Sequence, residues 1–229
     1  MPEQPPGPRG LTVKLRTARG RTTASQKWLQ RQLNDPYVRA AQQQGLRSRA
    51  AFKLMELDDK LQLLKPGSRV VDLGAAPGGW SQVAVKRGAS VVVGVDLLPV
   101  DPVSGSTLFV GDFNDPAVQV QLREMLGGTA TIVLSDMAPN TTGHTATDHL
   151  RIVALAELAF IFATEILEPG GAFIAKVFQG GTERSILAPM KRHFASVRHI
   201  KPAASRKESS ELYVVATGFR GEKAVPSEM

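Results

Sequence analysis

The stretch Asp72-Leu-Gly-Ala-Ala-Pro-Gly-Gly-Trp80 joins a short apolar run to a helix-like segment that starts near Gly79. Its glycines permit a tight turn and a close approach of the backbone to a ligand. The spacing of Gly74, Gly78 and Gly79 does not fit the G-x-G-x-x-G pattern of dinucleotide sites, and no Lys-Ser/Thr pair follows as in a phosphate-binding loop. The stretch therefore predicts a strand–turn–helix unit that either binds another kind of ligand or serves the fold alone.

The chain around this stretch continues the same alternation of short apolar runs and segments of helix length. The runs are Arg69–Leu73, Val91–Asp96, Thr107–Asp112, Thr131–Asp136 and Ala172–Phe178. Such alternation is typical of βαβ units and a buried parallel sheet. Two later runs, Ser196–Lys201 and Glu211–Phe219, leave no room for a helix between them and predict an antiparallel pair. We expect an α/β fold with a mostly parallel seven-stranded sheet, an antiparallel last strand and helices on both faces.

A single domain over residues 25–219, with a helical part at 25–64, accounts for all these elements. In that helical part, Asp35-Pro36 predicts the start of one helix and Ser48 predicts the cap of a second. Residues 1–24 and 220–229 lack apolar periodicity, and we expect them to form a flexible basic arm and a flexible tail.

Charge divides the 229-residue chain into three parts. Residues 1–65 carry 13 Lys and Arg against 5 Asp and Glu, residues 66–170 carry 5 against 11, and residues 171–229 carry 10 against 5. The basic ends favour a surface that meets a polyanion, although a merely solubilising surface has the same balance. The absence of cysteine excludes disulfides and thiolate zinc sites, and neither a secretory signal nor a bilayer-spanning stretch is visible.

Four of the predicted strands end in aspartate, at Asp72, Asp96, Asp112 and Asp136. In an open α/β sheet, ligands bind at the carboxyl ends of the strands. One such aspartate could simply cap a helix, but four in succession favour a ligand rich in hydroxyl and amino groups. Asp96 is placed to bind ribose hydroxyls and Asp112 to meet an adenine amino group. An adenosine without phosphates fits this pattern, so we expect S-adenosylmethionine as the cofactor.

Three charged residues stand out further along the predicted strands and helices. Lys176 lies within the buried run 172–178, where a lysine is costly unless it is paired or reactive. Lys53 and Glu211, taken as isolated residues, are expected to be surface charges. The four histidines lack the spacing of metal ligands, so no metal is expected.

Six stretches, in order along the chain, resemble the FtsJ/RlmE family of RNA 2′-O-ribose methyltransferases. They are Leu46-Arg-Ser-Arg-Ala-Ala-Phe-Lys53, Asp72-Leu-Gly-Ala-Ala-Pro-Gly-Gly-Trp-Ser-Gln82, Asp96-Leu-Leu-Pro99, Ser135-Asp-Met-Ala-Pro-Asn140, Lys176-Val-Phe-Gln-Gly180 and Ser205-Arg-Lys-Glu-Ser-Ser-Glu-Leu-Tyr213. The resemblance implies a Rossmann-like, S-adenosylmethionine-dependent methyltransferase fold. It implies a catalytic tetrad of Lys53, Asp136, Lys176 and Glu211. It also implies cofactor contacts at Gly78, Trp80, Asp96, Asp112 and Asp136.

The chemistry of the tetrad can be argued from residue types. A ribose 2′-hydroxyl is a poor nucleophile, so a base has to take its proton as it attacks the methyl group. Lys176 could be that base, because burial and the second cation, Lys53, favour a neutral amine. Asp136 would orient Lys176 and Glu211 would orient Lys53, and which lysine is deprotonated stays open. Arg47 and Arg49 lie beside Lys53 and are candidates for gripping RNA phosphate, with solvated helix charges as the alternative.

Within the family, the chain resembles members that methylate a uridine in the A-loop of large-subunit (23S-type) ribosomal RNA, in the peptidyl-transferase centre. The alternatives are a methyltransferase of the tRNA anticodon loop and a ribosome-assembly factor with weak catalysis. A base-amine methyltransferase is disfavoured because Asp136-Met-Ala-Pro139 lacks the expected aromatic residue, and an oxidoreductase because of the glycine spacing. We expect a monomer that binds the large ribosomal subunit and no membrane, in the bacterial cytoplasm or, alternatively, in mitochondria.

Overall fold

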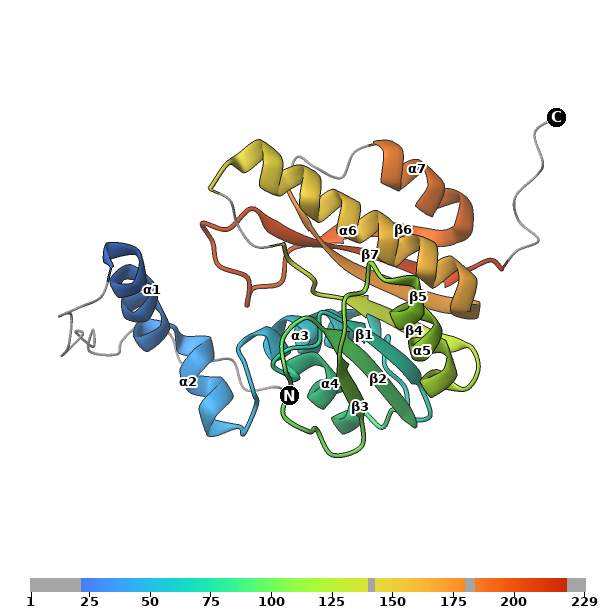
Figure 1. Ribbon diagram of the computed structural model, residues 1–229, viewed down its shortest axis with the longest axis horizontal. Coiled ribbons are helices and arrows are strands. Elements are labelled where there is room, and N and C mark those ends of the chain that lie inside the picture. Colours follow the sequence, from blue (N-terminus) through green and yellow to red (C-terminus); the bar gives the residue numbers. More distant parts are fainter. Residues whose placement is uncertain (1–21, 140–142, 180–183, 222–229) are drawn as a thin grey trace.

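Strand β1, Arg69–Leu73, belongs to a seven-stranded sheet in the computed structural model, which describes residues 22–139, 143–179 and 184–221 (Figure 1). The other strands are β2 Val91–Asp96, β3 Thr107–Val110, β4 Ala130–Ser135, β5 Leu167–Phe178, β6 Phe194–Ile200 and β7 Glu211–Phe219. Their order across the sheet is β3-β2-β1-β4-β5-β7-β6. Neighbours from β3 to β5 pair in parallel, whereas β7 pairs antiparallel with both β5 and β6. The predicted sheet is therefore confirmed.

Three strands differ in length from the prediction: β6 begins two residues earlier, at Phe194, and β3 and β5 differ for local reasons. Strand β3 ends at Val110 because the carboxylate of Asp112 accepts the N–H of Asn114, 2.9 Å away, which turns the chain out of the sheet. Strand β5 begins at Leu167 because this residue pairs with Ala130 before the register shifts. The prediction had placed the start of that strand at residue 172, where the continuous apolar run begins.

Seven helices connect or precede the strands in the described residues. They are α1 Thr23–Asn34, α2 Pro36–Gln43, α3 Ala50–Leu61, α4 Gly79–Lys86, α5 Pro116–Leu126, α6 Thr145–Ile166 and α7 Arg184–His193. The predicted helix start at Asp35-Pro36 is confirmed, since the Asp35 carboxylate accepts the N–H of Tyr37 at 3.0 Å. The predicted cap at Ser48 is wrong. Arg49 occupies the cap position, and within the described ranges the Ser48 hydroxyl has no hydrogen-bond partner.

The predicted boundary of the N-terminal arm also needs a correction. Helix α1 begins at Thr23, and the Thr22 hydroxyl accepts the N–H of Ser25 at 3.2 Å. Residues 22–24 therefore belong with this helix, and the rest of the arm, 1–21, lies outside the described residues. Strand β7 ends at residue 219. Residues 222–229 of the predicted tail, like residues 1–21, lie outside the described residues. Figure 1 shows α1 and α2 standing off to one side of the sheet.

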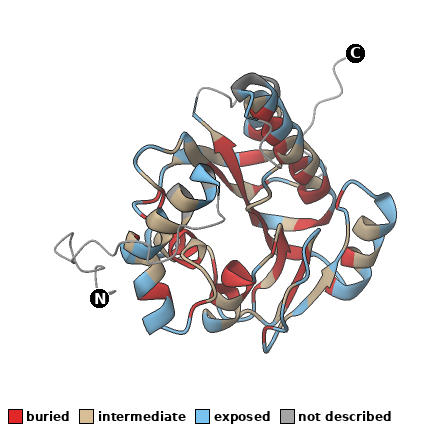
Figure 2. Cartoon of the chain, turned by 60° about the vertical axis from the view of Figure 1, so that its left-hand side comes forward, coloured by how far each residue is buried: buried red, intermediate tan, exposed pale blue. Residues whose placement is uncertain are grey.

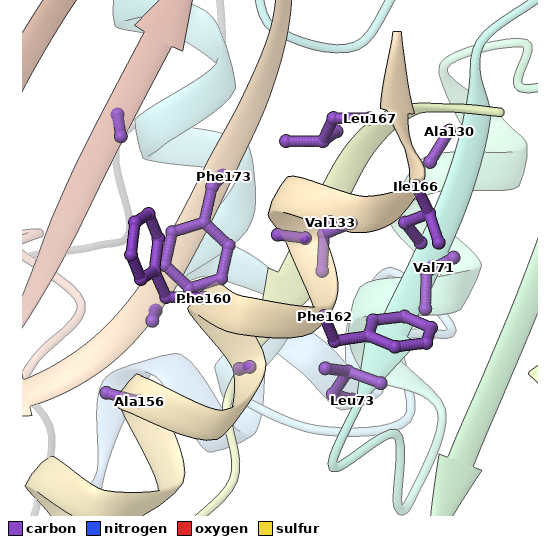
Figure 3. Close-up of a cluster of buried hydrophobic side chains, with 14 of the residues drawn as sticks. Val71, Leu73, Ala130, Val133, Ala156, Phe160, Phe162, Ile166, Leu167 and Phe173 are labelled. Carbon is purple, nitrogen blue, oxygen red and sulfur yellow. The ribbon is translucent and has the colours of Figure 1, made fainter. Parts of the chain in front are cut away.

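Apolar side chains fill both faces of the sheet, so the strands are the most buried elements (Figure 2). Helices α5, α6 and α7 cover one face, where Phe160 of α6 lies against Phe173 of β5 with ring centroids 6.1 Å apart (Figure 3). Helices α3 and α4 cover the other face with Leu54, Leu57 and Val83. The expected helices on both faces are thus present. In the described part of the chain, every helix is too short or too polar to span a bilayer.

The antiparallel strand β7 determines which residues share the edge of the sheet where the site lies. Because β7 runs against β5, its first residue, Glu211, pairs with Phe178 at the carboxyl end of β5. Two residues further on, Tyr213 pairs with Lys176. Paired residues on adjacent strands lie on the same face of a sheet, so Lys176, Glu211 and Tyr213 all lie on the α3 side.

Candidate active site

The loop after β1 passes close under the end of β4, and two of its glycines are required by this packing. Gly74 has φ +79°, and a Cβ there would lie 2.8 Å from the backbone of Met137. Gly78 has φ +99°, and a Cβ there would lie 2.9 Å from Val103 and 3.1 Å from Arg47. A side chain at either position would strain the backbone and displace a neighbour. The loop then enters α4 at Gly79, as the sequence predicted.

A cavity of about 390 Å³ opens beside this loop, at the carboxyl ends of β1, β2 and β4. Its lining is formed by Gly74, Val95, Asp96, Leu97, Gly111, Asp112, Phe113, Asn114, Met137, Ala138, Pro139, Arg151, Ala154 and Leu155. The Asp96 carboxylate accepts the N–H of Ala76 and the N–H of Leu98, both at 2.9 Å, which fixes its position. Asp112 is exposed, and hydrogen bonds from the backbone and side chain of Asn114 lower its pKa. Asp112 is therefore ionised at neutral pH, and hydrogen bonds hold both carboxylates in place.

Three other predicted cofactor residues, Gly78, Trp80 and Asp136, do not line this cavity. The Trp80 side chain is buried, its Nε1–H donates to the carbonyl of Ala50 at 2.8 Å, and its ring centroid lies 5.5 Å from that of Tyr213. Trp80 thus packs between the loop, α3 and β7. Gly78 contributes the left-handed backbone at which the loop turns into α4.

Asp72, like Asp136, is absent from the cavity lining, but its surroundings differ from those of the other strand-end aspartates. Its side chain is fully buried, and one carboxylate oxygen accepts the Ser81 hydroxyl at 2.6 Å. The other oxygen has no hydrogen-bond partner among the described residues. Burial raises the pKa of Asp72 to about 7, although the bond from Ser81 opposes the shift. The expectation that all four strand-end acids face one ligand is therefore wrong for Asp72.

Next to the cavity, the structure brings Asp136 and Lys176 together. Lys176 Nζ lies 3.0 Å from Asp136 Oδ1 and donates to the Asp136 carbonyl at 2.5 Å. Only 8% of Lys176 is exposed. The ion pair with the Asp136 carboxylate and the hydrogen bond to the Asp136 carbonyl thus offset the free energy that burying a lysine in the strand costs. Asp136 also links the two parts of the site, because the following residue, Met137, lines the cavity.

A second ion pair lies on the other side of this cluster. Lys53 Nζ of α3 lies 2.6 Å from Glu211 Oε1, and only 8% of Lys53 is exposed. The expectation that these two are surface charges when taken alone is wrong, because α3 packs its Lys53 against the start of β7. The Ser205 hydroxyl donates to Glu211 Oε1 at 2.9 Å and holds the carboxylate from the side opposite β7.

Tyr213 joins the two ion pairs, and the sequence did not single it out. Its hydroxyl donates to Asp136 Oδ1 at 2.7 Å and accepts from Lys53 Nζ at 3.1 Å. A buried tyrosine in a strand generally needs a partner for its hydroxyl, and this was the available signal. Burial and the charges of Asp136 and Glu211 raise the pKa of Tyr213 well above its usual value, so the phenol stays protonated.

The electrostatics of Asp136 follow from these neighbours. Burial alone would raise its pKa. The charges of Lys176 and Lys53, together with hydrogen bonds from Tyr213 and Lys176, outweigh burial and hold the pKa below its ordinary value. The site therefore contains a firmly ionised carboxylate between two lysines. Among the described residues, no three acidic or histidine side chains are grouped so that they could hold a metal ion.

The structure gives Arg47 and Arg49 partners within the chain, which the sequence did not predict. Arg47 Nη1 donates to the carbonyls of Asp101 at 2.6 Å and Pro77 at 3.3 Å. Arg49 Nε lies 3.2 Å from Asp35, and its Nη2 donates to the carbonyl of Ala204. Both arginine side chains thus contact other parts of this chain.

A seven-stranded sheet in this order, with a glycine turn after β1 and acids at the ends of β2 and β3, defines a Rossmann-like methyltransferase. The model of the FtsJ-like methyltransferase family matches residues 46–219. The chain belongs to this family, as the six stretches indicated.

Relatives and a solved structure agree with this assignment. The chain is 71% identical over 95% of both chains to a protein of Granulibacter bethesdensis named ribosomal RNA large subunit methyltransferase E. It is 67% identical to a protein of that name from Gluconobacter oxydans, over 96% of this chain and 82% of the relative. A crystal structure of a ribosomal RNA methyltransferase from Plasmodium falciparum is 30% identical, with a TM-score of 0.67. That match covers 76% of this chain and 99% of the other.

Proposed function

We propose that this chain transfers a methyl group from S-adenosylmethionine to the ribose 2′-hydroxyl of a uridine in large-subunit ribosomal RNA. The target we favour is the A-loop of the peptidyl-transferase centre in the assembled subunit. The observation that carries the proposal is the geometry of Lys53, Asp136, Lys176 and Glu211. These four side chains, from four separate elements, form one hydrogen-bonded cluster next to a cavity bordered by acids.

The chemistry of the cavity supports S-adenosylmethionine as the cofactor. Two fixed carboxylates, Asp96 and Asp112, border it, and such groups accept hydrogen bonds from ribose hydroxyls and from an adenine amine. They would repel the phosphates of a nucleotide. Gly74 allows the chain to approach closely at the side nearest Asp136. When bound, S-adenosylmethionine supplies a methyl group activated by a positively charged sulfur.

The tetrad supports proton removal from a hydroxyl group. In our mechanism Lys176 Nζ takes the proton of the 2′-hydroxyl as the hydroxyl oxygen attacks the methyl carbon, and bound S-adenosylmethionine would supply that methyl group, the electron pair of the broken bond staying with sulfur. The resulting ammonium is stabilised by the carboxylate and the carbonyl of Asp136, which already contact Nζ. Lys53 remains paired with Glu211, so two cations face two anions and the cluster carries no excess charge.

A basic segment beside the tetrad supports RNA as the substrate. No acidic residue occurs from Arg184 to Lys207, a stretch with seven Lys and Arg. At the carboxyl end of β6 and in the loop before β7, Lys201 and Lys207 are exposed. Strand β6 runs parallel to β5, because both are antiparallel to β7, so its carboxyl end lies at the same edge as the tetrad. Phosphate groups on both sides of a target nucleotide would meet this surface.

The relatives support the choice of large-subunit RNA, since they carry that substrate in their names and come from bacteria. We accordingly place the enzyme in the bacterial cytoplasm as a monomer that binds the large subunit. A tRNA methyltransferase and an assembly factor remain the competing functions, and the same experiment separates them.

The experiment is methyl transfer from labelled S-adenosylmethionine to ribosomal subunits and, in parallel, to tRNA, both taken from cells that lack this gene, so that the target is unmodified. Wild type is compared with Lys176→Ala and with Lys60→Ala, which removes an exposed lysine of α3. We expect alkali-resistant 2′-O-methyl label at one uridine of large-subunit RNA with wild type and Lys60→Ala. With Lys176→Ala, the rate falls by about 10²–10⁴. Label on tRNA would instead identify the protein as a methyltransferase of the tRNA anticodon loop. Bound cofactor without any label favours the assembly factor.

A further inference from the structure

The segment between α2 and α3 carries two arginines, Arg47 and Arg49, whose side chains reach opposite halves of the active site. This segment is bonded directly to the start of α4. The Arg47 N–H donates to Gln82 Oε1 at 3.1 Å, and Gln82 Nε2 donates to the Gly45 carbonyl at 2.7 Å. The segment is thus held at the base of the cofactor loop before either arginine side chain is considered.

Arg47 joins the two loops that border the cofactor cavity. Its guanidinium donates to the carbonyls of Pro77, Asp101 and Pro102, and the bonds to Asp101 and Pro102 are 2.6 and 2.5 Å long. Pro77 belongs to the loop after β1, and the other two belong to the loop after β2 that starts with Leu97 in the cavity wall. A planar group with several donors in a fixed fork can hold two backbone segments at a set separation.

Arg49 reaches in the other direction, to the loop that supports Glu211. Its Nε pairs with Asp35, which is 8% exposed, and its Nη2 donates to the Ala204 carbonyl. The N–H of Ala204 in turn donates to Glu56 at 3.0 Å. The next residue, Ser205, is the one whose hydroxyl contacts Glu211. Arg49 therefore fixes the backbone from which the second ion pair of the tetrad is oriented.

These contacts conflict with a role in RNA binding. To grip a phosphate, Arg47 would have to release carbonyls that hold the cavity, and Arg49 would have to leave a buried carboxylate. Lys207, by contrast, is exposed in the loop that leads to Glu211 and can contact phosphate at this edge of the sheet.

We propose that Arg47 and Arg49 are positioning residues, Arg47 for the cofactor cavity and Arg49 for the Lys53–Glu211 pair. This inference rests on the proposed function, since it assigns each arginine to one half of that site. It predicts that the two arginines affect different kinetic constants, although only Ser48 separates them in the sequence.

The test compares lysine and glutamine variants at each position. A lysine keeps the positive charge that a phosphate contact needs, but it cannot bridge two acceptors as the guanidinium fork does. We expect both Arg47→Lys and Arg47→Gln to weaken S-adenosylmethionine binding, measured by calorimetry without RNA, by about tenfold. We expect both Arg49→Lys and Arg49→Gln to lower kcat by about tenfold or more, with cofactor affinity unchanged.

The salt dependence of RNA binding distinguishes this positioning role from direct contact between the arginines and RNA phosphate. In our assignment the slope of log K against log salt stays at the wild-type value in all four variants, while the control variant Lys207→Gln reduces it. The proposal is overturned if the glutamine variants lose about one unit of slope each, the lysine variants restore it, and cofactor affinity and kcat stay normal. It is also overturned if Arg47 variants bind the cofactor as wild type does. If wild type binds no S-adenosylmethionine, the proposed function itself fails, which the calorimetry shows separately.

Discussion

The two halves of the active site are constructed differently. The cofactor half is made largely by backbone: a glycine loop, the N–H groups that hold Asp96, and short strand ends within residues 72–114. The catalytic half is made by side chains of Lys53, Asp136, Lys176 and Glu211, which come from α3, the end of β4, β5 and β7. A contiguous stretch can specify the first half, whereas only the complete tertiary fold can assemble the second. The two halves should therefore respond separately to substitution.

The largest expected effect is on the catalytic half. Lys53→Met removes the cation that pairs with Glu211 and donates to Tyr213, so the cluster loses its charge balance. We expect kcat to fall by about 10² and the cofactor affinity to change less than about twofold. Single-turnover kinetics and calorimetry measure the two quantities, with Lys60→Met on the same helix as the control. A large loss of cofactor affinity in Lys53→Met would show that the two halves are not separable.

The reciprocal change is Asp96→Asn on the cofactor half. The substitution removes the charge and one of the two acceptors that hold the N–H groups of Ala76 and Leu98. We expect cofactor affinity to fall by about thirtyfold, because hydrogen bonds to charged groups contribute roughly 1.5–3 kcal/mol. At saturating cofactor, kcat should stay within about threefold of wild type. Asp101→Asn, an exposed acid in the same loop, is the matched control, and an equal effect there would contradict the assignment.

A smaller effect should distinguish Tyr213 from the tetrad. Tyr213→Phe keeps the ring in the core but removes the hydroxyl between Asp136 and Lys53. Loss of its two hydrogen bonds to charged groups should lower kcat by about tenfold. Tyr37→Phe changes the chain's other tyrosine, whose hydroxyl contacts Glu56, and should keep wild-type kcat. Equal rates in the two variants would leave Tyr213 as a packing residue only.

The smallest effect concerns stability and not activity. Because the pKa of Asp72 is about 7 in the folded protein and near 4 when unfolded, the folded state binds more protons between these values. Its stability therefore falls as pH rises through that window, by about 1 kcal/mol between pH 6 and pH 7. Asp72→Asn should lack this part of the pH dependence, whereas Glu124→Asn, at an exposed position, should retain it. Urea unfolding at several pH values measures the difference, and parallel curves for wild type and Asp72→Asn would contradict it.

The cofactor half of the site could be predicted from the sequence to a greater extent than the catalytic half. The glycine loop, the alternating strands and the antiparallel last pair were predictable, because each depends on neighbouring residues or on a period of apolar positions. Lys176 could be singled out because it is a charged residue within a strand predicted to be buried. Lys53 and Glu211 carried no local signal, and only the resemblance to the family placed them in the tetrad. Tyr213 was missed because the partner of its hydroxyl lies 77 residues away.

The arginines show most clearly what local patterns omit. Arg47 donates to backbone carbonyls, which every residue possesses, so nothing in the sequence marks those partners. Ser48 has the residue type of a helix cap, yet the packing of the segment against α4 leaves Arg49 at the cap position. In both cases tertiary contacts outweighed the local structural preference of the residue type.

The place of β7 in the sheet has a consequence for how the enzyme comes into being. The ribosome synthesises the cofactor cavity first, since its lining ends at Leu155, and it adds Glu211 and Tyr213 only with the last strand. That strand is inserted between β5 and β6, so it also completes the sheet. A chain that stops before residue 211 lacks Glu211, Tyr213 and the strand that connects β6 to the rest of the sheet. Catalytic competence and completion of the sheet are therefore reached together, once β7 has been synthesised.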